Sequence, residues 1–197
     1  MCLAGCVKPD QRELPRKLAA MTPANISAAA HIVDDPGQPH VVISTRSAFR
    51  NARPIAGGLQ AQAYLSAKIE RRTGATQIQL WQKTLYKGAR KDFHQVNYRS
   101  QDRLVAHGLA QAVHEPDDCP GVDRPGSCVL AKTAAFDLSE GLVREIATLY
   151  KPGSREAWTF RLKDRNGRDV TSGIAPVEAL GLLQALDQWR EGRGSPG

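Results

Sequence analysis

The feature that most constrains the fold of this chain is a strict alternation of apolar and polar side chains. Between Ala61 and Ile69 every second residue is apolar, and the residues between them are polar or amphipathic. A period of two is typical of a β-strand that buries one face and exposes the other. Half-buried strands of this kind are typical of antiparallel sheets, so the alternation predicts one here.

The residues that follow predict how this strand pairs. Thr73-Gly74 is expected to reverse the chain into a second strand. With that turn, Ile69 is expected to face Ile78, and the apolar face continues across the pair. Ala67 is correspondingly expected to face Leu80. Beyond position 80 the apolar residues shift to odd-numbered positions, which predicts a bulge or a strand covered on both faces.

Further strands are predicted on both sides of this hairpin. Apolar runs at 28–33 and 40–49 flank a segment rich in Asp, Pro and Gly, which is typical of a hairpin. Segments 93–99, 103–115 and 129–136 are also predicted to be strands. A last hairpin alternates from Trp158 to Lys163, and Asn166-Gly167 favours a type I′ turn.

Two helices are predicted in the C-terminal half. Asp137 and Glu140 are spaced like a capping box, and apolar residues recur at helical spacing as far as Tyr150. Pro176 begins a terminal helix with one apolar face. The predicted fold is therefore α+β, with an antiparallel sheet of about six to eight strands and both helices on one face. A β-sandwich is the alternative.

Length and composition indicate one folded unit. The chain has 197 residues, of which 41% are hydrophobic and 24% charged, and these values argue against a disordered, collagen-like or coiled-coil chain. We assign residues 28–191 to a single α+β domain and expect residues 192–197 to form a disordered tail. No run of about 18 apolar residues occurs, so any membrane attachment is expected to be peripheral or covalent.

The most specific motif is Leu3-Ala4-Gly5-Cys6. Small residues before the cysteine leave room for a peptidase, and the thiol can be alkylated by a lipid. The motif resembles the lipobox of bacterial lipoproteins. The resemblance implies lipidation of Cys6, with residues 1–6 the remnant of a signal whose leader is truncated, since only five residues precede the cysteine. It also implies a periplasmic, lipid-anchored domain, and Val7 in place of a retention Asp favours the outer membrane.

Residues 7–27 are predicted to be a flexible tether between the anchor and the domain. Pro9, Pro15 and Pro23 lie among charged residues and alanines, without a sustained helical or strand period. A tether of this kind would lift a folded domain away from a membrane surface.

Two further cysteines, Cys119 and Cys128, lie in a segment rich in Pro and Gly. In an oxidising periplasm they are expected to form a disulfide, which would stabilise the fold by about 2.7 kcal/mol for a loop of this length. Free thiols are one alternative. A metal site that also uses His114, Glu115 and Asp117 is the other, although no Cys-x-x-Cys or His-Glu-x-x-His spacing supports it.

One stretch combines aromatic and basic residues in the way that proteins stack single-stranded bases or sugars. The chain has 27 Lys and Arg against 20 Asp and Glu, a formal net charge of +7, but no block of five like charges. The competing interpretation is that the aromatic side chains are core and the cations solvated. The predicted patch consists of Trp81, Lys83, Tyr86, Lys87, Arg90, Lys91, Tyr98 and Arg99.

The sequence contains no recognisable catalytic motif and implies no cofactor or metal. The Gly192-x-Gly194-x-x-Gly197 spelling follows a predicted helix and has no strand before it, so it is interpreted as tail. Two Asp pairs, Asp34-Asp35 and Asp117-Asp118, could bind a cation through adjacent carboxylates, but such pairs are also typical of turns without a metal. The possible general bases are His31, His40, His94, His107 and His114, whose spacing does not predict convergence.

These observations favour a non-enzymatic cell-envelope lipoprotein whose domain binds a partner or serves in assembly. The expected partners are the membrane, through Cys6, and an envelope protein or anionic polymer. The first alternative is a basic cytoplasmic domain that binds single-stranded nucleic acid, although nucleic acid is the disfavoured partner because the charge is dispersed. The second alternative is an envelope hydrolase, which would require His or Asp side chains to meet in a cleft.

Overall fold

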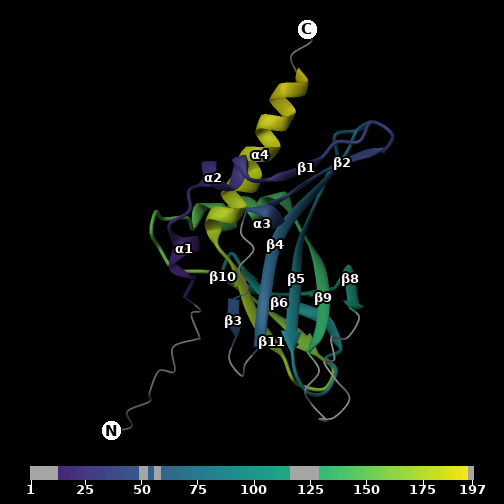
Figure 1. Cartoon of the computed structure of the whole chain (residues 1–197), viewed down its shortest axis with the longest axis vertical. Coiled ribbons are helices and arrows are strands. Elements are labelled where there is room, and N and C mark those ends of the chain that lie inside the picture. The colour runs from purple at the N-terminus through teal and green to yellow at the C-terminus, as the bar shows by residue number, and fades with distance from the viewer. Residues whose placement is uncertain (1–12, 49–52, 56–58, 116–128, 195–197) are drawn as a thin grey trace.

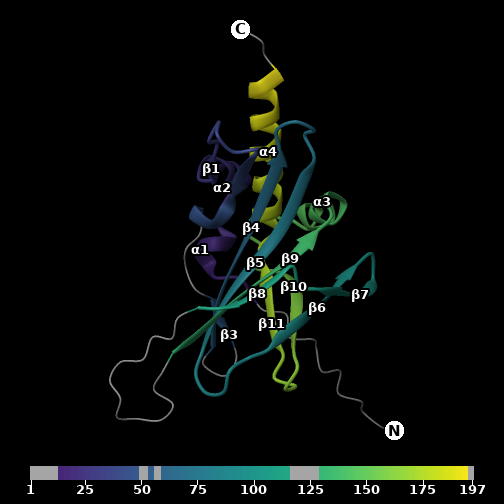
Figure 2. The same ribbon diagram turned by 90° about the vertical axis from the view of Figure 1, so that its right-hand side faces the viewer.

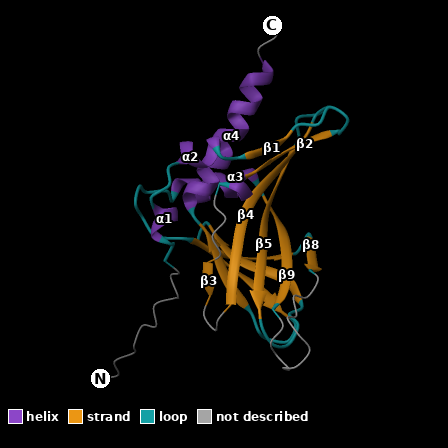
Figure 3. Ribbon diagram, in the orientation of Figure 1, coloured by secondary structure: helices purple, strands orange, loops and turns teal. Residues whose placement is uncertain are grey.

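A computed structural model of the chain describes residues 13–48, 53–55, 59–115 and 129–194. Helices gather at one end of the molecule and strands extend to the other, with helix α4 projecting beyond the sheets (Figures 1 and 3). Several sequence predictions lie outside the described residues: the lipidation site at Cys6, the Cys119–Cys128 bridge and the Asp117-Asp118 pair. The same holds for residues 7–12 of the predicted tether and 195–197 of the predicted tail.

The larger of two antiparallel sheets, the large sheet, has seven strands in the described part of the chain, and β4 and β5 are the longest. Its order is β1-β2-β4-β5-β9-β8, with β3 paired to β4. Its strands are β1 (His31–Val33), β2 (His40–Ser44), β3 (Arg53–Ile55), β4 (Leu59–Glu70), β5 (Thr76–Tyr86), β8 (Gln111–His114) and β9 (Leu130–Leu138). A 3-10 turn, η1 (Thr45–Ser47), follows β2.

The second sheet, the small sheet, has four strands in the order β11-β10-β6-β7. It lies against one half of the large sheet, where the ring centroids of Phe136 on β9 and Phe160 on β10 are 5.2 Å apart (Figure 2). Its strands are β6 (Phe93–Ser100), β7 (Arg103–Gly108), β10 (Trp158–Asp164) and β11 (Val170–Ile174).

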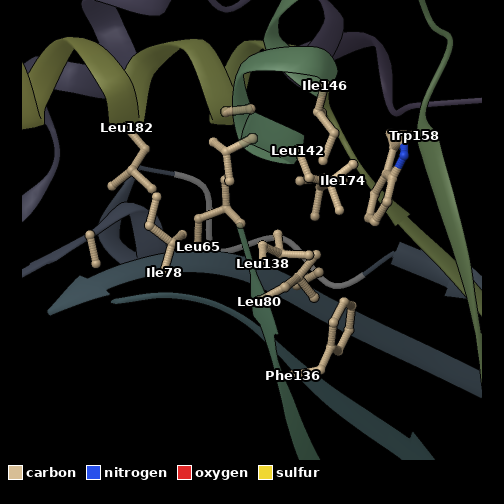
Figure 4. Close-up of a cluster of buried hydrophobic side chains, with 14 of the residues drawn as sticks. Leu65, Ile78, Leu80, Phe136, Leu138, Leu142, Ile146, Trp158, Ile174 and Leu182 are labelled. Carbon is tan, nitrogen blue, oxygen red and sulfur yellow. The ribbon is translucent and has the colours of Figure 1, made fainter. Parts of the chain in front are cut away.

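Helices α3 (Glu140–Thr148) and α4 (Pro176–Gly194) cover the other half of the same face of the large sheet. We call this covered face the inner face and the opposite one the outer face. Side chains of the helices and of both sheets form one continuous apolar core, and Figure 4 shows Leu182 and Ile146 above Leu65, Leu80 and Phe136. Burial of this core is the main force that holds the layers together.

The predicted α+β class with antiparallel strands is confirmed, and the two predicted C-terminal helices pack on one face of the sheet. The small sheet packs face to face on part of the large sheet, which is the kind of contact that the alternative prediction of a β-sandwich required. None of the helices in the described residues is both long enough and apolar enough to cross a bilayer.

The pairing of β4 with β5 differs from the prediction by two residues. Ile69 pairs with Thr76, and Ala67 pairs with Ile78. The reason is the loop, in which the Gly74 amide donates to the Glu70 oxygen at 2.8 Å and Gly74 adopts a φ of 73°. A shift of two residues keeps every side chain on its predicted face but changes its partner.

The change of apolar parity after Leu80 does not produce a bulge, because the pairing of β5 with both neighbours continues without a register shift. Gln82 and Thr84 take the inward positions instead and are fully buried. The Nε2 of Gln82 donates to the Lys83 backbone oxygen at 3.0 Å. Polar side chains therefore occupy part of the inner face, and Trp81 stays on the outer face.

The predicted tether is wrong for residues 13–27, which pack against the domain. Helices α1 (Arg16–Ala19) and α2 (Pro23–Ala28) bury Leu18 and Ile26 in a small cluster with Val177. A Cβ on Gly181 of α4 would lie 2.4 Å from the Cβ of Ile26, so the two helices approach at a position where only glycine fits. The capping box formed by Thr22 and Asn25 starts α2.

Three local predictions also need correction. The N-cap of α3 is Ser139, whose hydroxyl accepts the Leu142 amide at 3.1 Å, while Asp137 belongs to β9. Positive φ angles at Gln101 and Asp102, not at Asn166, show that the two-residue left-handed turn joins β6 to β7. Residues 192–194 continue α4 and are not a disordered tail.

Replacing Leu18 with Ala is expected to lower the free energy of unfolding by about 3 kcal/mol, because the side chain is fully buried. Lys17→Ala is the matched control on the exposed side of the same helix and should change it by less than about 0.5 kcal/mol. Denaturant titration of both variants measures the difference. Two equally small effects would show that the N-terminal helices are not part of the folded unit.

Candidate functional site

The helices and the small sheet pack on the inner face of β4 and β5, so the outward side chains of these two strands are partly or fully exposed. The alternation that places Leu65 and Leu80 inside directs their neighbours in sequence outward. Successive pairs across the two strands are Gln62 with Lys83, Tyr64 with Trp81, Ser66 with Gln79 and Lys68 with Gln77. We call these eight residues the β4–β5 track.

An aromatic pair lies in the middle of the track. Tyr64 and Trp81 are directly opposite in the register, their ring planes differ by 6°, and their centroids are 6.2 Å apart. Both side chains are partly exposed. Parallel rings on an accessible sheet surface offer apolar faces against which a planar or ring-shaped ligand can stack.

A cation stands beside this pair. Arg46 belongs to η1, and its guanidinium carbon lies 5.7 Å from the centroid of the Tyr64 ring. The turn that carries it is fixed to β4, since Thr45 Oγ1 accepts the Leu65 amide at 2.9 Å. Burial raises the pKa of Tyr64, and the nearby Arg46 partly offsets that effect. The phenol is therefore neutral at physiological pH and can donate or accept a hydrogen bond.

Amide side chains extend the track towards the loop between the strands. The Nε2 atoms of Gln77 and Gln79 each donate to Oδ1 of Asp137 on β9, at 3.0 Å in both cases. This shared acceptor fixes the orientation of both amides. No described group donates to their amide oxygens, which remain available as acceptors for a ligand.

At the other end of the track, Lys83 is paired with Glu115, which follows β8. The second carboxylate oxygen of Glu115 accepts the Thr133 hydroxyl at 2.6 Å. The hydrogen bond from Lys83 is the main cause that lowers the pKa of Glu115, and the bond from Thr133 adds to it. The pair connects β5, β8 and β9 on the outer face and neutralises both charges locally.

A shallow cleft of about 400 Å³ lies on the same side of the molecule, where β2 meets the loop end of β4 and β5. It continues the track beyond the amides, because Lys68 and Gln77 belong to both. Its lining residues are Pro39, His40, Lys68, Glu70, Ala75, Thr76 and Gln77.

The aromatic and basic patch predicted from the sequence is not one surface. Only Trp81 and Lys83 lie on the outer face of the large sheet. Three members are buried, namely Tyr86, Lys91 and Tyr98. The remaining members are exposed elsewhere, with Lys87 and Arg90 in the loop between β5 and β6 and Arg99 on the outer face of the small sheet.

Buried ionisable groups tie the two sheets together at the end away from α4. Lys132 Nζ donates to the Lys91 backbone oxygen at 2.9 Å, and Lys91 Nζ donates to that of Arg168 at 2.8 Å. The Asp164 carboxylate accepts the Asp92 amide at 3.0 Å. Burial is the main cause that lowers the pKa of Lys91. All these groups are engaged internally, so we assign them a structural role.

The five histidines are distributed over five strands and do not form a common site. His31, His94, His107 and His114 are exposed, and His40 lines the shallow cleft. Asp34 forms an ion pair with Arg71, and Asp35 accepts the Gly37 amide at 2.9 Å, as expected of turn residues. The residues that the structure describes contain no group of three or more side chains able to hold a metal ion.

Comparisons with known proteins add no relative: no family model, no curated protein and no solved structure matches this chain.

Sequence reasoning missed Tyr64 and Arg46. The predicted register would have placed Tyr64 opposite Lys83, two residues away from Trp81. The alternating pattern already placed Tyr64 on the outer face. The correct loop length would have given the correct register and so predicted the pair with Trp81. Arg46 carried no sequence signal, because its place depends on the 3-10 turn after β2.

Replacing Glu115 with Gln is expected to destabilise the fold at neutral pH by about 1 kcal/mol, because a partly exposed charged hydrogen-bond partner is lost. Because the pKa of Glu115 is lowered in the folded state, its ionised carboxylate stabilises the fold at pH values above the ordinary carboxyl pKa of 4.5. That contribution is lost as the pH falls through the folded-state pKa, which lies below this value. The difference between wild type and variant should therefore shrink in acid.

Denaturant titrations at pH 7 and below pH 4 measure this effect, with the exposed Glu191→Gln as the control. A difference between wild type and Glu115→Gln that does not depend on pH would contradict the assigned pairing.

Proposed function

We propose that this protein is a non-enzymatic binding domain of the bacterial cell envelope, anchored by a lipid at Cys6, that holds an envelope polymer on the β4–β5 track. The observation that carries the binding proposal is the parallel and partly exposed Tyr64–Trp81 pair on the outer face of the large sheet. Neighbouring aromatic side chains that are partly exposed on one sheet face form an apolar surface of the kind that ligand-binding sites use.

The arrangement around the pair supports binding rather than chemistry. Carboxylates on this face are held in fixed interactions, Glu115 with Lys83 and Asp137 with two amides. General acid or base catalysis would need such a group to reach a reacting atom and change its protonation state. Rigid strands that present rings and fixed amides are instead suited to hold a ligand without altering it.

The lipid anchor belongs to the proposal because the Leu3-Ala4-Gly5-Cys6 motif indicates it. Each buried CH₂ of an acyl chain adds about 0.8 kcal/mol to membrane attachment, so several chains would hold Cys6 in a bilayer. Val7 favours the outer membrane. In this compartment a domain with a polymer-binding face would connect the membrane to another envelope layer.

Trp81→Ala is expected to weaken binding to isolated peptidoglycan sacculi by about fivefold or more, because one stacking interaction contributes about 1–3 kcal/mol. Co-sedimentation of the protein with sacculi measures the affinity. Leu104→Ala is the matched control, since Leu104 is 70% exposed and lies on the small sheet. Unchanged binding by Trp81→Ala, in a variant with the wild-type circular dichroism spectrum, would exclude the track as the binding surface.

Cys6→Ser is expected to abolish incorporation of labelled palmitate when the protein is produced from its native gene in its own cells. Cys2→Ser is the matched control in the same segment and should keep the label. Labelling is measured on immunoprecipitated protein. Absence of label in the wild type, or equal label in both variants, would remove the anchor from the proposal.

A further inference from the structure

We infer that the ligand of the β4–β5 track is a linear acidic polysaccharide that runs along the two strands and has carboxylate groups that pair with Arg46 and Lys68. This inference rests on the proposed function and specifies the chemical class of the ligand.

The length of the track favours a chain over a single sugar. Its residues on β4 extend from Gln62 to Lys68, which corresponds to about 20 Å at the usual rise of a strand. Hydrogen-bonding side chains lie at both ends, and the aromatic pair lies between them. A linear polymer could stack on the rings and still reach the polar groups on either side, whereas a monosaccharide could not.

The polar groups of the track match the chemistry of a sugar chain. The amide oxygens of Gln77 and Gln79 are oriented by Asp137 and can accept hydrogen bonds from hydroxyl groups. Ser66 lies opposite Gln79 and adds a hydroxyl that both donates and accepts. Successive neutral donors and acceptors beside an aromatic surface suit a ligand with many hydroxyl groups and one apolar ring face.

The charges indicate that this chain is acidic. Lys83 is paired with Glu115, and Glu70, which lines the same cleft as Lys68, forms an ion pair with Arg72 at 3.9 Å. Arg46 and Lys68 are exposed, and among the described residues neither lies within ion-pair distance of a carboxylate. These two cations flank the aromatic pair, one beside Tyr64 and one at the shallow cleft. Arg46 is close enough to Glu115 to contribute to the lowered pKa of that carboxylate, but Glu115 is already paired with Lys83. Carboxylates of a bound chain would give Arg46 and Lys68 direct ion pairs, and guanidinium is well suited to them.

Single-stranded nucleic acid fits the track less well. Its binding depends on cations that follow a phosphate backbone of one charge per nucleotide, together with several stacking rings. The track has one aromatic pair and two available cations. Lys87 and Arg90 lie in the loop after β5 and do not extend the positive charge along the track. Two separated cations match the sparser charge of a polysaccharide.

The experiment compares two soluble polymers with the same backbone, polygalacturonate and its fully methyl-esterified form, by titration calorimetry. Wild type is expected to bind the acid form more tightly. The double variant Arg46→Gln, Lys68→Gln should bind the acid form about fivefold more weakly, because two exposed ion pairs are lost. Its affinity for the ester should equal that of wild type. Lys17→Gln with Lys151→Gln is the charge-matched control at exposed positions off the track.

The outcomes separate this inference from the proposed function. If wild type binds both polymers equally and Trp81→Ala abolishes this binding, the inference of an acidic ligand is overturned. The track would then remain a binding surface. Binding of single-stranded DNA but of neither polymer would overturn the inference, and binding of no polymer or sacculus would overturn the proposed function as well. If Arg46→Gln loosens the turn that carries it, Lys68→Gln alone provides the same comparison.

Discussion

The pairing of β4 with β5 is the interaction on which the rest of this structure depends. Ten consecutive residue pairs, from Gln60 with Leu85 to Ile69 with Thr76, hold the two strands in one register. Because side chains alternate, the same register that collects Leu65 and Leu80 for the core also aligns Tyr64 with Trp81 on the other face. A slip of one residue would turn the core side chains of one strand to the outer face.

The inner face of this hairpin packs against two different layers, the helices and the small sheet. Near the loop its leucine and isoleucine side chains pack against α3 and α4, while the other half faces the small sheet. There Ala61 and Ala63 leave room for buried Gln82 and Thr84, and Lys132 donates to the backbone across the sheet interface. Both halves are therefore covered on the inner face, and neither the helices nor the small sheet cover the outer face.

Much of the fold could be predicted from local patterns, because alternation in β4 and the helical spacing after Ser139 are properties of short segments. The register could not, since it depends on the loop conformation at Gly74. Nor could the docking of α1 and α2, because Leu18 and Ile26 find their partners on α4 and the residue before it, far along the chain. For the site, the sequence identified Trp81 and Lys83 but grouped them with side chains that tertiary packing buries or moves to other surfaces.

The most direct test of the account is a heteronuclear NMR titration of the domain with solubilised polygalacturonate. If the β4–β5 track is the binding surface, the largest shift changes will appear at the Trp81 indole N–H and at the side-chain amides of Gln77 and Gln79, and the buried Trp158 indole will stay unchanged. Changes centred on the small sheet or the loop after β5, with Trp81 unaffected, would contradict it.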